Sequence, residues 1–432
     1  MTGLSENART VAGLACIDPR QARAQRRAFA AAALALAVLF AGNNLPSALY
    51  GLLRVEFGYS SLVQTLLYAV PVVLVVLPGL LVFGTLSDVT GRRGLIAAGL
   101  VAFGTGDVLF ITADDTGWLF AARLLQGLGI ALASAAATAT LSDTAAGMSA
   151  DRIQGQKVAA LTATMSITGG LAAGPLLGGA LAQYAPDPRV VPFAVHLGLV
   201  VAALAVAWCI PGKDQAAARQ WRIARLKIPE GVRRSFPEIA SAEFVAWAVL
   251  GVFSAVIATL IGTILRTGNL AVTAGSLTLM IGASAAAQLA ARWLRPLTAQ
   301  WAGLSALATG LSLLVVTTAT RTVAFAVLAM IGSGVGHGLV FAGSLSEVTV
   351  ATPARKRGAV LGVVYFVNYL GLGFPVIGVG VLSLRLGLVQ ATSAVSVAIA
   401  VLCLLLIPWA FRVRTANGLR AEADRPADGS SR

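Results

Sequence analysis

Long apolar runs separated by short polar segments dominate this chain from residue 28 onward. Each run contains roughly twenty residues, the length that an α-helix needs to cross the hydrocarbon core of a bilayer. Because the bilayer core offers backbone groups no hydrogen-bond partners, such runs are expected to be helical. The pattern predicts an all-α membrane protein with twelve transmembrane helices at residues 28–53, 62–83, 95–113, 117–141, 158–184, 190–210, 243–265, 270–291, 298–320, 322–345, 358–383 and 386–411.

Composition and charge support a membrane protein and orient it. Hydrophobic residues make up 57% of the chain and charged residues only 12%, about half of what a soluble protein carries. If the N-terminus is cytoplasmic, 26 of the 32 Lys and Arg lie in cytoplasmic segments, Arg123 lies within a span, and five lie outside: Arg54, Arg189, Arg266, Arg321 and Arg385. The positive-inside rule therefore places both termini in the cytoplasm. Because the basic residues lie in short segments between spans, the net charge of +14 does not indicate nucleic-acid binding.

The chain divides into two related halves. Equivalent residues recur at an offset of 200, namely Lys157 and Arg357, Pro175 and Pro375, and Gly178 and Gly378. Duplicated halves are typical of secondary transporters, which move one half against the other around a site near the middle of the membrane. The predicted organisation is a cytoplasmic tail at 1–27, a six-helix bundle at 28–211, a cytoplasmic loop at 212–242, a second, pseudo-symmetric six-helix bundle at 243–411 and a cytoplasmic tail at 412–432.

The segment between the second and third spans carries a recognisable motif, Gly84-Thr-Leu-Ser-Asp88-Val-Thr-Gly91-Arg92-Arg93. Its small residues permit a tight turn, and its arginines can contact lipid headgroups. The spacing and place of this motif resemble motif A of the major facilitator superfamily. That resemblance implies a gating latch at the cytoplasmic ends of the two halves, with Arg92 between Asp88 and Asp143. An alternative is that these residues only fix the topology.

The fourth span carries an arginine inside the predicted bilayer, within Arg123-Leu-Leu-Gln126-Gly127-Leu-Gly129. This stretch resembles motif B of the superfamily, and a charge at this depth is usually paired or functional. Asp107 in the third span lies at a matching depth, so the sequence predicts an ion pair between Asp107 and Arg123. Asp107 is then either a structural counter-ion or a protonation site that couples protons to transport.

The fifth span contains Gly170-Leu-Ala-Ala-Gly174-Pro175-Leu-Leu-Gly178-Gly179. Small residues at this spacing form a close helix-packing face, and the proline adds a bend. The pattern resembles motif C, which belongs to the drug:proton antiporters of the superfamily. The resemblance implies a proton-coupled exporter. A proton-coupled importer with ordinary small-residue packing in this span is the alternative.

The superfamily resemblance implies that spans 1, 4, 7 and 10 line a central cavity. Polar or bent positions in and near these spans are candidate substrate contacts: Asn43, Asn44, Pro46, Tyr50, His337 and Asn368. Asn43 and Asn44 could instead form hydrogen bonds between helices, and His337 could be a neutral packing residue. His196 lies in a peripheral span and is expected to have no chemical role.

Few charges are expected in this cavity, which suits a small, moderately hydrophobic organic substrate such as a drug or secondary metabolite. No phosphate-binding loop and no clustered catalytic set occur in the sequence, so neither an ATP-driven pump nor an enzyme is predicted. No cofactor or metal site is expected, and a sensor with a transporter fold is the remaining alternative. The abundance of Arg over Lys is typical of a GC-rich bacterial genome, so we expect a bacterial inner-membrane protein. The superfamily resemblance further implies a monomer, with protons as the coupling ion.

Overall fold

The computed structural model describes residues 19–83, 90–148, 151–212, 233, 236–352 and 357–423, which contain helices and turns but no β-strand. Twelve helices in this part of the chain are long and apolar enough to cross a membrane, and this confirms the predicted number. The elements are α2 Pro19–Asn44, η1 Leu45–Ala48, α3 Tyr50–Phe57, α4 Ser61–Pro71, η2 Val72–Val76, α5 Leu77–Phe83, α7 Arg92–Ile111, α8 Thr116–Met148, α9 Arg152–Tyr184, α10 Val190–Ala207, α12 Phe236–Leu265, α13 Leu270–Ala290, η3 Ala291–Trp293, α14 Pro296–Thr320, α15 Val323–Ala351, α16 Arg357–Leu386 and α17 Leu388–Ala423.

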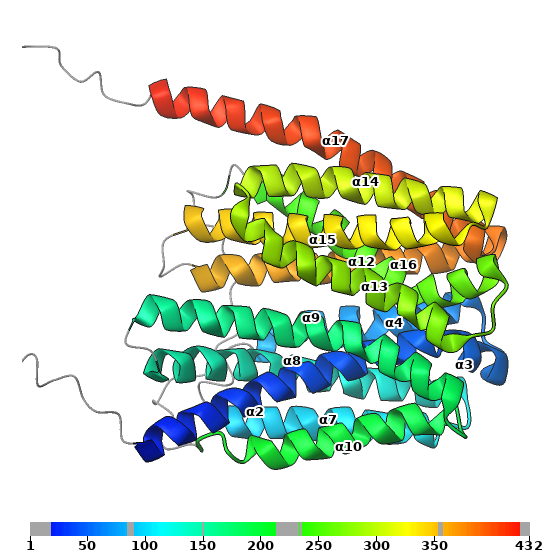
Figure 1. Ribbon diagram of the computed structural model, residues 1–432, viewed down its shortest axis with the longest axis horizontal. Helices are drawn as coiled ribbons and strands as arrows, with labels where there is room; N and C mark the ends of the chain where they lie inside the picture. Colours follow the sequence, from blue (N-terminus) through cyan, green and yellow to red (C-terminus); the bar gives the residue numbers. More distant parts are fainter. Residues whose placement is uncertain are drawn as a thin grey trace, which may run out of the picture.

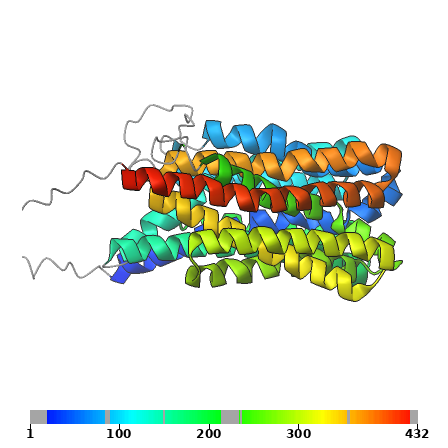
Figure 2. The same ribbon diagram turned by 90° about the horizontal axis from the view of Figure 1, so that it is seen from above.

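The helices form two bundles that lie side by side. Figure 1 shows α2 to α10, coloured blue to green, below α12 to α17, coloured green to red. The helices run along the long axis of the molecule in both views (Figures 1 and 2), and α2 and α13 are inclined to it in opposite directions in Figure 1. The first turn of α2 and the last turn of α17 lie at the same end of the molecule (Figure 1). An even number of crossings requires this arrangement.

The first two spans are interrupted rather than continuous. The predicted run 28–53 is divided by the 3₁₀ turn Leu45–Ala48, which contains Pro46. The second span changes from α-helix to the π-helical segment Val72–Val76 directly after Pro71. Proline removes a backbone donor, and π segments occur often at functional sites. Two of the first six spans therefore depart from a regular α-helix, and each does so next to a proline.

Hydrogen bonds join the two bundles on the side away from the chain ends. Gln64 Nε2 on α4 donates to a carbonyl oxygen of α12 at 2.9 Å. The backbone nitrogen of Leu270 on α13 donates to Gln183 Oε1 on α9 at 2.8 Å. Gln64, Gln183 and Leu270 each lie near the end of a helix opposite to the end at which α2 begins. Nearer the middle, Thr278 Oγ1 on α13 donates to the Ala172 carbonyl oxygen on α9 at 3.0 Å.

Several helix boundaries differ from the predicted ones. The largest consequence is at α12, which begins at Phe236 instead of residue 243. Glu243 therefore lies about two turns inside this helix and not at its first residue. Most of the predicted central loop, 213–232 and 234–235, lies outside the described residues.

Candidate functional site

A buried acid and a buried histidine face each other in the N-terminal bundle. Asp107 on α7 and His196 on α10 are both completely shielded from solvent. His196 Nδ1 lies 2.7 Å from Asp107 Oδ2, and His196 Nε2 lies 2.9 Å from the carbonyl oxygen of Val38 on α2. Gly42 leaves room for the ring, since a Cβ atom there would overlap the imidazole and the ring of Phe103. His196, for which the sequence predicts no chemical role, therefore lies in direct contact with a buried acid.

Gln126 connects this pair to the arginine of motif B. Gln126 Nε2 donates to Asp107 Oδ1 at 2.9 Å, and Gln126 Oε1 accepts from Arg123 Nη1 at 2.8 Å. Arg123 Nε also donates to the Leu67 carbonyl oxygen at 3.1 Å. The predicted depths of Asp107 and Arg123 agree with this arrangement. The predicted direct ion pair is wrong, because in the described part of the chain the Asp107 carboxyl group contacts His196 and the amide of Gln126 lies between the acid and the arginine.

Asn44 connects two helices. Its Nδ2 donates to the Leu171 carbonyl oxygen on α9 at 3.1 Å, and its Oδ1 accepts from Ser47 Oγ at 3.1 Å. Asn44 is completely buried. These contacts are those of the interhelical alternative, and a contact of Asn44 with substrate stays a prediction.

Two of the other candidates of the first span lie beside Arg123. The carbonyl oxygen of Asn43 accepts from Arg123 Nη1 at 3.1 Å. Tyr50, at the start of α3, is completely buried and lies beside the guanidinium group. Pro46 is buried in the 3₁₀ turn that joins α2 to this region. The Asn43 carbonyl thus belongs to the same polar network as Asp107, and Tyr50 lies at the edge of that network.

The glycines of motif C press α9 against the backbone of α2. A Cβ atom at Gly170, Gly174 or Gly178 would collide, in that order, with the carbonyl oxygens of Ala37, Ala41 and Leu45. Both sets repeat every four residues, so one face of α9 follows one row of carbonyls that runs from α2 into η1 along more than two turns. Gly179 instead faces Ala274 and Leu270 on α13, in the other half. Pro175 lies within α9 beside this row.

A second buried acid lies in the C-terminal bundle, within a group that we call the Glu243 cluster: Glu243, Trp247, His337, Phe341, Asn368 and Tyr369. Glu243 on α12 is completely buried, and its Oε2 accepts from Trp247 Nε1 at 3.2 Å. The Trp247 ring lies 5.5 Å from the ring of His337, between ring centres. Asn368 on α16 lies beside the carboxylate. The predicted cavity residues His337 and Asn368 are thus brought together around an acid that the hydrophobic pattern places at the end of a span.

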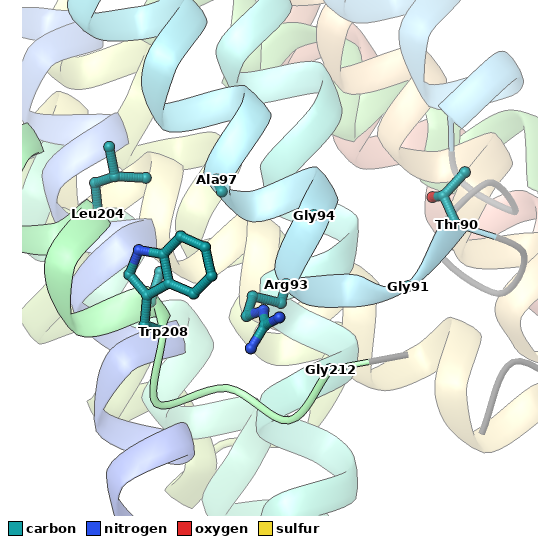
Figure 3. A pocket seen from close by; sticks show the side chains of 9 residues that line it. Thr90, Gly91, Arg93, Gly94, Ala97, Leu204, Trp208 and Gly212 are labelled. Atoms are coloured by element: carbon teal, nitrogen blue, oxygen red, sulfur yellow. The ribbon is translucent and has the colours of Figure 1, made fainter. Parts of the chain in front are cut away.

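A cavity of about 260 Å³ opens where the first turn of α7 faces the last turn of α10 (Figure 3). Arg93 and Trp208 line it, with the guanidinium carbon 4.8 Å from the centre of the indole ring. This cavity lies at the ends of its helices and includes no residue of the Asp107 network or the Glu243 cluster. We assign it no part in substrate binding.

The sequence profile described as Major Facilitator Superfamily matches residues 32–376, most of the chain. The chain belongs to this superfamily. Two solved structures agree with this assignment at the level of the fold. Both are of a bacterial homolog of the human lysosomal transporter Spinster in an inward-facing conformation, one occupied and one unoccupied. The occupied structure has a TM-score of 0.71 and is 14% identical to this chain, and the unoccupied one has a TM-score of 0.70 and is 15% identical. Each match covers 90% of this chain, and the two matches cover 96% and 97% of the respective solved chains.

A curated relative shares part of the sequence. The puromycin resistance protein pur8 of Streptomyces alboniger is 34% identical to this chain over 152 residues. The matched stretch covers 35% of this chain but only 28% of that protein. The match thus spans less than a third of the relative's length.

Only part of the superfamily's motif A lies among the residues that the structure describes. Gly84 and Asp88 lie outside the described residues. Arg92, in the first turn of α7, forms an ion pair with Asp143 on α8 and donates to the Ala139 carbonyl oxygen at 3.1 Å. Gly91 precedes the helix with φ of 89°, a conformation that favours glycine. The predicted contact between Arg92 and Asp143 is therefore present, and its role in gating stays a prediction.

Proposed function

We propose that this superfamily member is a secondary active transporter that exports a small, moderately hydrophobic organic molecule in exchange for protons. The proposal places it in the bacterial cell membrane with both chain ends in the cytoplasm, as the distribution of Lys and Arg suggests. The observation that carries the proposal is the buried pair of Asp107 and His196, which can hold one exchangeable proton inside the membrane.

The hydrogen bonds of His196 define where that proton resides. The Val38 carbonyl can only accept a hydrogen bond, so Nε2 of His196 carries a hydrogen. A second hydrogen must then lie between Nδ1 and Asp107 Oδ2, either on the imidazole or on the carboxyl group. If this hydrogen leaves, a carboxylate faces the lone pair of Nδ1, and the two repel each other. Release of the proton thus favours a different arrangement of the two side chains, as coupling to a conformational change requires.

Because Arg123 lies in the same buried network, the proton changes the net charge of that network. With the proton bound, Asp107, His196 and Arg123 together carry one positive charge, and without it they are neutral. Charge differences of this kind are strongly felt where little water is present. Tyr50 lies beside Arg123 and belongs to a hydrophobic core that includes residues of both halves. We infer that loss of the proton draws the Asp107 carboxylate toward Arg123, because the Gln126 amide already bridges the two groups.

Two observations favour export over import. The row of glycines that matches motif C is packed in full register against α2, and this motif belongs to antiporters in the resemblance described above. The relative from Streptomyces alboniger is named for resistance to puromycin, which fits removal of a toxic compound. Hydrogen bonds between the halves lie at the end away from the chain ends, which supports a conformation closed to the outside, a state that exporters and importers share.

Transport in membrane vesicles tests direction and coupling together. We expect inside-out vesicles with an acidic lumen to accumulate labelled puromycin, because protons leaving the lumen would drive the compound inward. A protonophore should abolish the accumulation, and right-side-out vesicles should not accumulate it. Vesicles without the protein correct for passive partition at each pH. Accumulation that is equal with and without the protein for puromycin and for other organic probes such as ethidium would contradict export.

The contact between Arg92 and Asp143 gives a smaller prediction. The Asp143 side chain is 66% exposed, so the ion pair is worth about 1 kcal/mol or less. We expect Asp143→Asn to lower the unfolding temperature by only a few degrees while slowing transport, because the charge would act on gating. Asp143→Glu keeps the charge and should preserve the rate. Unchanged transport by Asp143→Asn would show that the pair has no gating role.

A further inference from the structure

Glu243 is an acid inside the membrane that has no cationic partner in the described part of the chain. Its side chain is completely buried in α12, and none of the ion pairs among the described residues includes it. Trp247 Nε1 donates to Oε2. Ser344 and Asn368 lie beside the carboxylate, but Oε1 makes no hydrogen bond of good geometry in the described part of the chain. A buried carboxylate is costly unless a positive charge or donors complete its environment, so a cation bound beside Glu243 would be stabilised by this open acceptor.

Aromatic rings surround the indole that contacts this acid. Trp247 lies edge-on to His337 at 5.5 Å and to Phe341 at 5.7 Å, and its ring centre is 6.4 Å from that of Tyr369. The four rings come from α12, α15 and α16. The faces of tryptophan, tyrosine and phenylalanine attract organic cations, most strongly away from water. An acid at the edge of an aromatic group is the chemistry that binds an ammonium ion attached to an apolar body.

Other polar atoms of the cluster also lack partners. His337 Nε2 and both side-chain amide atoms of Asn368 are buried and make no hydrogen bond of good geometry in the described part of the chain. His337 Nδ1 is engaged by Ser284 Oγ at 2.8 Å, so the ring is held with its other nitrogen free. Buried polar atoms without partners are uncommon in folded proteins. A bound molecule with polar substituents could satisfy them.

The Glu243 cluster lies next to the other half of the protein. Tyr369 packs against a hydrophobic core cluster whose buried members all belong to the N-terminal half. Trp247, Phe341 and Tyr369 are half-buried, while the acid behind them is completely buried. A ligand that entered between the halves would meet the aromatic rings first and the carboxylate last.

We propose that the Glu243 cluster binds the positively charged nitrogen of an organic cation, with the aromatic rings holding its apolar body. This proposal rests on the proposed function, since it makes the exported molecule an organic cation. Glu243 neutralises the charge, Trp247 and Tyr369 contact the body, and Asn368 and His337 bind polar substituents.

Equilibrium binding of two ions of nearly the same shape tests the charge preference. Tetraphenylphosphonium is a permanent aromatic cation, and tetraphenylborate is the matching anion. We expect the purified full-length protein to bind the cation at least about tenfold more tightly than the anion, because the two differ only in the sign of their interaction with the carboxylate. Equal affinities, or a preference for the anion, would overturn the proposal.

Substitutions locate the site of that preference. Glu243→Gln should weaken binding of tetraphenylphosphonium at least about tenfold, while Glu243→Asp should retain most of it. Asp114→Asn, a change at an exposed acid in a loop, is the matched control and should bind normally. If Glu243→Gln does not fold, Trp247→Leu replaces it and should weaken binding severalfold. Normal binding of the cation by the folded variant would overturn the assignment.

These experiments can reject the cation site and the export function independently of each other. Binding that depends on Glu243, together with no transport in vesicles, would leave the cation site in place and remove the export function. Transport that is unaffected by Glu243→Gln, together with unchanged binding, would remove the cation site and leave export in place.

Discussion

Replacing Gly174 with leucine is expected to prevent α9 from packing on α2 and to abolish transport. A Cβ atom at this position would overlap the Ala41 carbonyl oxygen and lie 3.1 Å from the backbone nitrogen of Leu45. These neighbours are backbone atoms of a buried segment, so no side-chain rotation can relieve the collision. The helices would have to separate, and overpacking of this kind typically costs about 1–3 kcal/mol. Thermal unfolding in detergent and transport in vesicles would measure the two effects.

Gly169 provides the matched control on the same helix. A Cβ atom at Gly169 would meet nothing within 4 Å, and the residue is exposed. Gly169→Leu removes a glycine from the same helix and adds the same side chain, so it should leave the unfolding temperature unchanged or raise it slightly. If Gly174→Leu and Gly169→Leu unfolded at the same temperature, close packing by motif C would be the wrong explanation of its glycines.

The sequence predicts the number of spans because hydrophobic length is a direct consequence of bilayer thickness. It does not reveal how two of the spans are interrupted. Pro46 marks the position of the 3₁₀ turn, but nothing in Val72–Val76 distinguishes a π-helical segment from an α-helix. That segment lies where another helix approaches closely, since Gly127 of α8 lies against Pro71 just before it. The hydrophobic pattern of a single span does not show which other helix will pack against it.

The site is predictable only where depth in the membrane is informative. Asp107 and Arg123 are found at matching depths from their distances to the span ends, and the structure connects them through Gln126. Depth alone cannot identify which helix is the neighbour, so it does not single out His196 on α10 as the partner of Asp107. The available signal is a histidine in the outer part of a span, at a depth that matches that of Asp107.

The sequence does not predict that Glu243 lies inside the bundle, and the reason is different. The apolar run begins at residue 243, so its first residue is expected at the membrane surface. The helix begins earlier because Phe236 and Ile239 pack into a small hydrophobic cluster with α15 and α16, and this carries Glu243 into the bundle. Whether a charged residue ends a span or lies inside it depends on such packing.

Asp107→Asn is expected to abolish proton-driven transport without unfolding the protein. The amide nitrogen that this substitution introduces could donate to Nδ1 of His196 while Nε2 still donates to the Val38 carbonyl, so both hydrogen bonds of the histidine can persist. The side chain would then imitate the protonated state permanently. Because no proton can leave, an imposed pH gradient should no longer drive accumulation above the level of vesicles without the protein.

Exchange of labelled for unlabelled substrate separates this explanation from simple damage. Exchange needs the halves to move but requires no net release of a proton, so Asp107→Asn should retain it while losing gradient-driven accumulation. His196→Gln, which keeps a donor and an acceptor, should show the same combination. Asp114→Asn, at an exposed acid, should behave as the wild type in both assays. If Asp107→Asn accumulated substrate normally in response to a pH gradient, the buried pair would be a structural contact between α7 and α10. If it lost exchange and accumulation together while remaining folded, Asp107 would act in substrate binding or movement of the halves instead of in proton coupling.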